Sequence, residues 1–220
     1  ALIVGMGGLG APAAQFLAAA GVGRITLCDA DRVDLTNLQR QILYDTEDIG
    51  VPKVDAARAR LTEINPEVDL VTVAARVGDA ELATRVADAH VVLDCSDNFA
   101  TRHAVNRAAV AARVPLVSGA ALRFDGQVAV FDARDPASPC YHCLFGEGDE
   151  LEETRCATMG VFAPVVGIIG STQAAEALKL IAGVGRSLAG RLLLLDALAM
   201  QWREVAVPRD LQCAVCGGRA

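Results

Sequence analysis

The chain has 220 residues, of which 53% are hydrophobic and 21% are charged, and its formal net charge is −7 at pH 7. This length suits one substantial α/β core and is short for two full domains. The acidic balance argues against a nucleic-acid-binding surface, which is normally a basic stripe. The sequence has no run of 18 apolar residues and no secretory leader, so we expect no membrane span and a cytoplasmic location.

The first motif is the glycine turn Gly5-Met6-Gly7-Gly8-Leu9-Gly10, which lies between an apolar run and an alanine-rich run. This order predicts a strand over 2–4 and a helix over 11–20. Since the chain begins inside that strand, we expect an N-terminal piece to be missing. Glycine lets the backbone come close to a ligand, and the N–H groups that begin a helix attract phosphate. Such a turn also occurs where a helix merely packs closely on a sheet, so its neighbours must decide.

An acidic residue, Asp29, ends the second expected strand, 24–28. Asp29 lies 19 residues after the last glycine of the turn, where nucleotide-binding sheets carry the acid that holds a ribose hydroxyl. Asp31 is the alternative for this role. The plain alternative for both residues is that they start a turn or cap a loop at the end of the strand.

A polar and basic cluster follows that an ordinary dehydrogenase does not carry. Residues 36–41 read Thr-Asn-Leu-Gln-Arg-Gln, and Lys53 follows a proline in the first turn of a helix expected over 51–61. An arginine and a lysine that converge on a nucleotide site neutralise triphosphate oxygens, which a dinucleotide lacks. We therefore predict that Arg40 and Lys53 bind a triphosphate. Each residue also has an alternative explanation when it is considered alone. Arg40 could be an ordinary surface arginine, and Lys53 could be a lysine that buries only the carbon chain of its side chain.

The remaining elements complete a doubly covered sheet. The patterns predict strands over 68–74, 90–95, 115–120 and 127–132, helices over 79–87, 99–112 and 161–182, and a closing hairpin of 192–195 with 202–207. The helix over 161–182 is expected to be buried in the protein rather than in a membrane. We predict an α/β, Rossmann-like fold: a mainly parallel twisted sheet with helices on both faces, C-terminal antiparallel strands and a structural zinc staple.

Asp97 and Asn98 follow the strand expected over 90–95. Ligand sites in such sheets lie at the carboxyl ends of strands. Asp97 should therefore face the same crevice as Gly8, where a carboxylate can hold Mg²⁺ on phosphate oxygens. Either residue also suits the N-cap of the helix that begins at 99. Capping and metal binding are compatible roles for two neighbouring residues.

Four of the seven cysteines form two pairs, Cys140-Tyr141-His142-Cys143 and Cys213-Ala214-Val215-Cys216. In a cytosolic chain, two such pairs predict a zinc site made of four thiolates. Two unrelated pairs or disulfides are the alternative. The 69 residues between the pairs exceed the spacing of a zinc finger, so the zinc would join distant segments. Because four thiolates fill a tetrahedral shell, the zinc is expected to be structural and His142 a bystander.

Together these motifs resemble the ThiF/MoeB/HesA family, the bacterial relatives of the ubiquitin-activating enzymes. The resemblance follows, in order, the glycine turn, Asn-Leu-Gln-Arg-Gln at 37–41, Pro52-Lys53, Asp-Cys-Ser-Asp-Asn at 94–98, the segment 119–127 and both cysteine pairs. It implies one adenylation domain over 1–220. Within it, the nucleotide-binding part covers about 1–120, a crossover loop about 136–160, and zinc knuckles 140–143 and 213–216.

The resemblance also implies a reaction and its partners. Members use ATP and Mg²⁺ to adenylate the C-terminal glycine of a ubiquitin-like sulfur-carrier protein that ends in Gly-Gly, of the ThiS or MoaD kind. This step releases pyrophosphate and enables thiocarboxylate formation for thiamine or molybdenum cofactor biosynthesis, with a cysteine desulfurase or a rhodanese as sulfur donor. Members are homodimers and receive an arginine from the partner's N-terminal segment, so this chain is expected to be incomplete as a catalyst.

Site residues take their roles by the same similarity. Gly8 lies against the phosphates, Asp29 holds the ribose, and the nucleotide pocket is lined by Thr36, Asn37, Leu38, Gln39 and Arg40. Arg40 and Lys53 stabilise charge in the transition state, and Asp97 places Mg²⁺ with Asn98 beside it. The attacking carboxylate is already ionised at pH 7, so no general base is needed. Positioning and charge neutralisation are expected to carry the catalysis.

Cys156 is the last catalytic candidate. It follows Arg155 directly, and a neighbouring cation lowers the pKa of a thiol. It resembles the cysteine that forms an acyl-disulfide with the carrier in the thiamine branch. The alternative is an exposed cysteine without a role. Cys28 and Cys95 lie at strand ends and are expected to be inert core residues.

Three alternative functions stay open on the sequence. An NAD(P)-dependent oxidoreductase would use the glycine turn and Asp29, but it leaves Arg40, Lys53 and the cysteine pairs without a purpose. A tRNA-modifying relative would activate a carboxylate on RNA, and the acidic balance and paired cysteines favour the sulfur carrier instead. A binding-only paralogue is disfavoured by the presence of Arg40, Lys53 and Asp97. The motifs do not separate the thiamine branch from the molybdenum branch.

Overall fold

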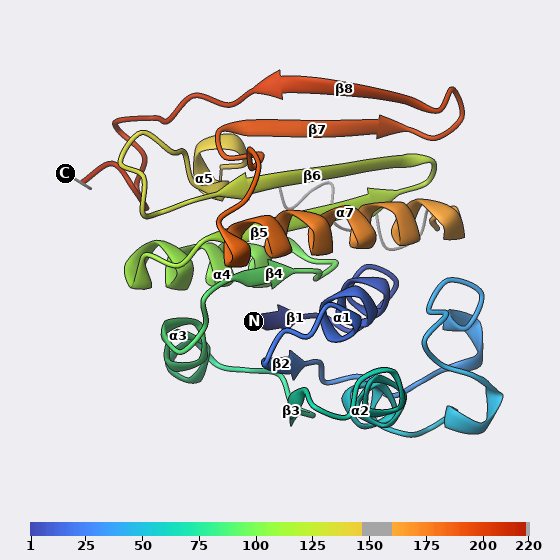
Figure 1. Ribbon diagram of the computed structural model, residues 1–220. Coiled ribbons are helices and arrows are strands. Elements are labelled where there is room, and N and C mark those ends of the chain that lie inside the picture. Colours follow the sequence, from blue (N-terminus) through green and yellow to red (C-terminus); the bar gives the residue numbers. More distant parts are fainter. Residues whose placement is uncertain (147–159, 219–220) are drawn as a thin grey trace.

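An eight-stranded sheet runs through the centre of the protein (Figure 1). The computed structural model describes residues 1–146 and 160–218. The strands are β1 (Leu2–Val4), β2 (Arg24–Cys28), β3 (Asp69–Val73), β4 (Val92–Asp94), β5 (Leu116–Leu122), β6 (Asp125–Phe131), β7 (Arg191–Asp196) and β8 (Gln201–Ala206). Their order across the sheet is β3-β2-β1-β4-β5-β6-β7-β8.

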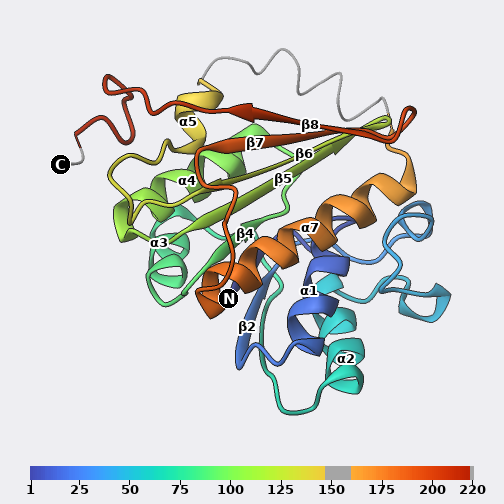
Figure 2. The same ribbon diagram turned by 45° about the horizontal axis from the view of Figure 1, so that its top comes forward.

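Helices cover both faces of the sheet (Figures 1 and 2). One face carries α1 (Gly10–Ala19), α2 (Lys53–Ile64) and α7 (Ala163–Ala182). The other carries α3 (Asp79–Ala87), α4 (Phe99–Ala112) and the short α5 (Tyr141–Leu144). Two 3₁₀ turns, η1 (Leu35–Asn37) and η2 (Thr46–Asp48), lie in the connection from β2 to α2. The predicted α/β fold with helices on both faces is confirmed.

Alternation along the strands divides the apolar side chains between the two layers. Ile3 of β1 and Leu93 of β4 pack into the cluster beneath α1 and α7. Their neighbours Leu2 and Val92 point to the opposite cluster, beneath α3 and α4. Successive side chains of a strand face opposite sides, so strands that are apolar at every position need cover on both faces.

Strand direction places several loops at one edge of the sheet. The pairs β3–β2, β2–β1, β1–β4 and β4–β5 are parallel. The carboxyl ends of β1, β2 and β4 therefore lie side by side, and the order reverses between β1 and β4, where ligands bind in open α/β sheets. The pairs β5–β6, β6–β7 and β7–β8 are antiparallel, which confirms the predicted C-terminal antiparallel strands.

The stretch expected to be a long loop, 136–160, contains a helix. Its described part includes α5, whose first residues lie between Cys140 and Cys143. The apolar signal is too short to reveal this single turn, which packs Tyr141 into the core at 1% exposure. Residues 147–159 lie outside the described part of the chain.

Helix α7 is long and apolar enough to cross a membrane by length and composition, as one candidate among the described residues. In the structure 44% of its apolar window is buried inside the protein. Its inner face includes the polar side chains of Gln173 and Glu176, which are both buried. Gln173 Nε2 donates to the carbonyl oxygens of Asp94 and Val117 at 2.8 and 3.2 Å, so α7 is joined to β4 and β5 as a core helix.

A glycine allows α7 to approach α1 closely, and its replacement should destabilise the fold. A Cβ on Gly170 would lie 2.2 Å from the carbonyl oxygen of Leu9 and 2.7 Å from Cγ of Pro12. Backbone cannot easily move away, so we expect Gly170→Ala to reduce the free energy of unfolding by about 2–3 kcal/mol. Denaturant titration would measure this loss.

Gly167, one turn earlier in α7, is the matched control for that substitution. A Cβ on Gly167 would meet no atom within 4 Å. Gly167→Ala should therefore be neutral, or stabilise the protein by up to about 1 kcal/mol through helix propensity. Equal losses in the two variants would show that close helix contact does not explain the glycine at 170.

Candidate functional site

The glycine turn joins β1 to α1 at the edge where β2 and β4 also end. Gly5 has φ +94°, and a Cβ there would lie 2.7 Å from the carbonyl oxygen of Cys95. A Cβ on Gly10 would lie 1.9 Å from the carbonyl oxygen of Gly5. Both positions therefore need glycine. Among the described residues no side chain caps the first turn of α1, so its dipole and N–H groups face the crevice in a form that suits phosphate.

Asp29 holds the glycine turn through the backbone. Its Oδ2 accepts a hydrogen bond from Met6 N at 2.6 Å, and its Oδ1 accepts one from Asp31 N at 2.8 Å. Each carboxylate oxygen has two acceptor positions, so Asp29 can still accept a ribose hydroxyl. Asp29 thus fixes the backbone of the glycine turn. It also lies at the position for which the sequence predicts a ribose contact.

Lys53 is buried at the start of α2 and forms an ion pair. Its side chain is 5% exposed, and Nζ lies 2.9 Å from Oδ2 of Asp31, whose side chain is 69% exposed. Pro52, the N-cap residue, keeps an extended backbone, so the helix begins at Lys53. The ammonium group of Lys53 therefore lies beside the loop that follows β2.

Arg40 folds back onto η1. Its Nη2 donates to Oδ1 of Asn37 at 2.7 Å, and its Nη1 donates to the carbonyl oxygen of Thr36 at 3.3 Å. The turn itself is capped by Asp34, which accepts hydrogen bonds from Thr36 N and Oγ1 at 2.8 and 2.6 Å. These bonds hold the pKa of Asp34 below its usual value. Thr36, Asn37 and Arg40 therefore form one hydrogen-bonded unit.

The neighbours of Arg40 lie in different surroundings. Leu38 packs against the core, and Gln39 is exposed. Gln41 is 4% exposed, and its Oε1 is buried without a hydrogen-bond partner among the described residues. Its Nε2 lies 3.5 Å from where a Cβ on Gly7 would be. A buried acceptor without a partner beside the glycine turn is typical of a site that a polar ligand completes.

Asp97 is exposed after the end of β4, on a loop that hydrogen bonds to buried side chains hold in place. The carboxylate of the buried Asp94 accepts hydrogen bonds from Ser96 N and Oγ and from Ser118 Oγ, at 3.1, 2.6 and 3.2 Å. Burial nevertheless raises the pKa of Asp94. Arg102 donates to the carbonyl oxygen of Ser96 at 3.0 Å. Hydrogen bonds therefore hold the loop in place, while the carboxylate of Asp97 stays exposed.

Asn98 is the N-cap of α4. Its Oδ1 accepts a hydrogen bond from Thr101 N at 2.9 Å, and its Nδ2 lies 3.3 Å from Oδ1 of Asp97. Of the two residues that suited the cap, the structure selects Asn98. Asp97 does not cap the helix, and it lies at the same sheet edge as the glycine turn.

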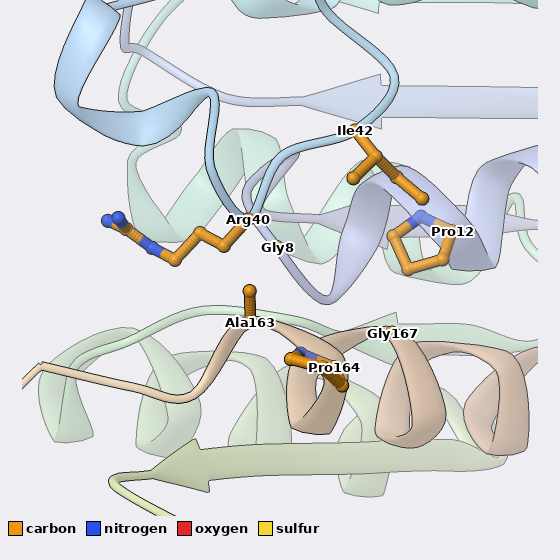
Figure 3. A pocket seen from close by; sticks show the side chains of 7 residues that line it. All are labelled: Gly8, Pro12, Arg40, Ile42, Ala163, Pro164 and Gly167. Atoms are coloured by element: carbon orange, nitrogen blue, oxygen red, sulfur yellow. The ribbon is translucent and has the colours of Figure 1, made fainter.

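A pocket of about 220 Å³ lies between the glycine turn and the start of α7. Figure 3 shows Ile42 and Pro12 on one wall and Ala163 and Pro164 on the other. The side chain of Arg40 runs away from Ile42 and Pro12 (Figure 3). The side chains of Pro12, Ile42, Ala163 and Pro164 make these walls apolar, so they suit an aliphatic group better than phosphate.

The two cysteine pairs meet in space. The Sγ atoms of Cys140, Cys143, Cys213 and Cys216 all lie within 4.8 Å of one another. Three of the separations are 3.9 Å (Cys140–Cys143), 3.7 Å (Cys140–Cys213) and 3.4 Å (Cys143–Cys216). A tetrahedral zinc with Zn–S bonds of about 2.3 Å requires sulfur separations of about 3.8 Å. The four thiols therefore fit zinc.

The cysteine cluster is joined to α4. Asn106 is 1% exposed; its Oδ1 accepts a hydrogen bond from Tyr141 N at 2.9 Å, and its Nδ2 lies 3.7 Å from Sγ of Cys140. Burial raises the pKa of the Cys143 thiol, and a bound cation would favour the thiolate instead. The ring of His142 packs edge-on against that of His103, with centroids 5.6 Å apart, and the four-cysteine group does not include His142.

Comparison with known proteins identifies the family. The model of the ThiF family matches residues 1–215 of the chain. The chain belongs to the ThiF family. It is 49% identical over 219 residues to the molybdopterin-synthase adenylyltransferase of Escherichia coli K12, covering 98% of this chain and 86% of that relative. It is 48% identical over 217 residues to the sulfur carrier protein ThiS adenylyltransferase of the same organism, covering 99% and 85%.

A solved structure supports the fold of this ThiF-family chain. The crystal structure of E. coli MccB with ATP superposes with a TM-score of 0.86 at 24% identity. The match covers 99% of this chain and 66% of that one, so the chain spans slightly less than two thirds of MccB. The family and its named relatives make the protein an enzyme of the adenylyltransferase class, and ATP use follows from that class.

Most of the residues predicted from the ThiF-family motifs lie at one edge of the sheet. The glycine turn, Asp29 and Asp97 follow β1, β2 and β4, and Lys53 is bonded to the loop after β2. Arg40 borders the same turn, because its carbonyl oxygen is 3.3 Å from where a Cβ on Gly8 would be. Cys156 lies outside the described residues.

Sequence reasoning missed residues that support this site. It did not foresee the pairing of Asp31 with Lys53, the buried amide of Gln41, or the bond from Arg102 to the Asp97 loop. One signal was available: Arg102 comes one helical turn after Asn98, where an arginine can reach back to the loop. The other two residues carry no local pattern that separates them from surface polar residues.

Proposed function

We propose that this protein uses ATP to adenylate the C-terminal glycine of a ubiquitin-like sulfur-carrier protein. The observation that carries the proposal is that the glycine turn and Asp97 follow neighbouring parallel strands at the same edge of the sheet, where Lys53 is bonded to the loop after β2. The relatives named for the molybdopterin and ThiS systems are nearly equal in identity, at 49% and 48%. The chemistry therefore supports a thiocarboxylate pathway, for thiamine or for molybdenum cofactor, without favouring one.

Binding and positioning would carry the reaction. The glycine turn and the first turn of α1 receive the phosphates, while Asp29 holds the ribose. Thr36, Asn37 and Arg40 form one side of the nucleotide pocket, with Leu38 and Gln39 contributing backbone. Lys53 and Arg40 neutralise charge that develops on the α-phosphate. The carrier's carboxylate is ionised at neutral pH, so these residues need to orient it rather than remove a proton.

The exposed carboxylate of Asp97 suits magnesium. Hard oxygen ligands from one or two carboxylates and from phosphate are the usual environment of Mg²⁺. When bound, Mg²⁺ would neutralise phosphate oxygens and the leaving pyrophosphate. Asn98 keeps the loop in place by capping α4, and Arg102 supports it through Ser96.

The cysteine cluster would hold a structural zinc. All four positions of the shell are protein thiols, so no position is open to a substrate. Such a zinc joins the segment after β6 to the C-terminal segment after β8. We further propose one functional domain over residues 1–220, a homodimer, a cysteine desulfurase or rhodanese as sulfur donor, a cytoplasmic location, and the acyl-disulfide role for Cys156.

The proposal is tested by pyrophosphate exchange from ATP, run separately with a ThiS-type carrier, a MoaD-type carrier and a tRNA pool. We expect exchange that depends on one Gly-Gly-tailed carrier, and the carrier that supports it identifies the pathway. A carrier from which the last glycine has been deleted is the control and should be inactive. Exchange that requires tRNA would support the tRNA-modifying relative, and tight NAD binding without exchange would support an oxidoreductase.

A further inference from the structure

The buried ammonium group of Lys53 is held by a carboxylate that has no role in the reaction described above. Nζ lies 2.9 Å from Oδ2 of Asp31. The backbone repeats the link, because Lys53 N donates to the carbonyl oxygen of Asp31 at 2.9 Å. An ammonium group has three N–H donors, so this ion pair leaves two of them for a ligand.

Asp31 is itself tied to the glycine turn. Its backbone N–H donates to Asp29, which in turn accepts from Met6 N. A continuous chain of hydrogen bonds thus runs from the glycine turn through Asp29 and Asp31 to Lys53. The place of the ammonium group relative to the glycine turn is therefore set by Asp31.

We propose that Asp31 is a positioning residue for adenylation: its carboxylate fixes the Lys53 ammonium group relative to the glycine turn and opposes binding of the nucleotide in the ground state. The inference rests on the proposed function and deepens it, because Asp31 acts through Lys53 and not on the ribose. Its side chain is 69% exposed, so the carboxylate faces the solution from which the nucleotide arrives.

Two effects of the carboxylate oppose each other. Its negative charge repels a polyanionic nucleotide at short range, which weakens binding. Its hydrogen bond fixes the ammonium group, and a fixed cation stabilises the charge that develops in the transition state better than a mobile one does. Interactions that are stronger in the transition state than in the ground state raise kcat. Removing the charge should therefore lower KM for ATP and kcat together.

The test compares Asp31→Asn with Asp69→Asn. Asn keeps a hydrogen-bond acceptor and removes the charge. Asp69 forms an exposed pair with Arg24 at 2.7 Å on the edge strand β3, so its substitution makes the same charge change away from the site. We expect Asp31→Asn to bind ATP about threefold or more tightly by calorimetry and to lose about tenfold in kcat. Asp69→Asn should leave both values unchanged.

Further readouts separate this role from a structural one. Without nucleotide, Asp31→Asn leaves the Lys53 charge without its carboxylate, so Tm should fall, and ATP should raise Tm more than it does in the wild type. Asp31→Glu keeps the charge and displaces the ammonium group; we expect near-normal ATP affinity with a reduced kcat. This second variant tests the proposal even where Asp31→Asn does not fold.

Two outcomes would overturn the inference. Weaker ATP binding by Asp31→Asn with an unchanged kcat would mean that the carboxylate contacts the nucleotide. A lower Tm with unchanged kcat and KM would mean that the ion pair serves only folding. ATP calorimetry needs no carrier, so a wild type that binds ATP but shows no carrier-dependent exchange would defeat the proposed function alone. In that case tighter binding by Asp31→Asn would still support the positioning of Lys53, and weaker binding would overturn it.

Discussion

Asp97→Ala is expected to lower the rate of adenylation by about 10³-fold while weakening ATP binding by less than about tenfold. Asp97 is exposed at the end of β4; its carboxylate accepts a hydrogen bond from the amide of Asn98 at 3.3 Å, and its charge also acts on the buried Arg102. Truncation therefore removes one long hydrogen bond, while the hydrogen bonds that Asp94 accepts beneath the loop remain. The magnesium ion proposed for this carboxylate would matter most where charge develops, so the loss should appear mainly in kcat.

Pyrophosphate exchange would measure the rate and calorimetry would measure ATP affinity at saturating Mg²⁺. Glu67→Ala is the matched control, because Glu67 is also an exposed acid. It lies just before the amino end of β3, whereas Asp97 follows the carboxyl end of β4. It should behave as the wild type does. Equal losses of rate and of ATP affinity in Asp97→Ala would contradict the magnesium role and point to a direct contact with the nucleotide.

Removal of zinc from the cysteine cluster is the second large effect, and it should act on stability. The cluster joins residues 140–143 to 213–216 across two distant parts of the chain. Loss of a structural metal costs about 4 kcal/mol or more. At about 2–4 °C per kcal/mol for a chain of this size, Tm should fall by about 8–16 °C. Metal analysis should find one zinc per chain.

Cys216→Ala and Cys28→Ala provide a matched pair for this prediction. Both cysteines are buried, at 0% and 3% exposure, but only Cys216 belongs to the cluster. We expect Cys216→Ala to lose zinc and the larger part of the stability, and Cys28→Ala to retain the metal. If chelation stopped pyrophosphate exchange while Tm stayed constant, the zinc would have to be catalytic.

The helices α3 and α4 could be predicted to the residue because their ends carry local signals. Asn98 caps the start of α4 with a side-chain hydrogen bond, and Arg113 ends it in the left-handed conformation at φ 54°. Helix α2 was predicted over 51–61, whereas in the structure it runs over Lys53–Ile64. Pro52 stays extended ahead of it, and Asn65, bonded to the carbonyl oxygen of Ala18 at 3.0 Å, ends it against a helix that the local sequence does not reveal.

The candidate site was predictable where a motif follows a strand. The glycine turn, Asp29 and Asp97 each come directly after an apolar run, and parallel strands bring such ends together. The orientation of Lys53 was not predictable in the same way. Its partner Asp31 is 22 residues away in the sequence, and no local sequence pattern around either residue predicts the ion pair.

The sequence by itself determined the fold class and the presence of the two cysteine pairs, because burial periodicity, glycine turns and caps depend on a few neighbouring residues. Tertiary structure alone decided the strand order that sets β1 beside β4, the sulfur separations that suit zinc, and the burial of Lys53 against Asp31. These depend on distances between side chains far apart in the chain. Such distances are set by the packing of the whole sheet and its helices, which no local pattern contains.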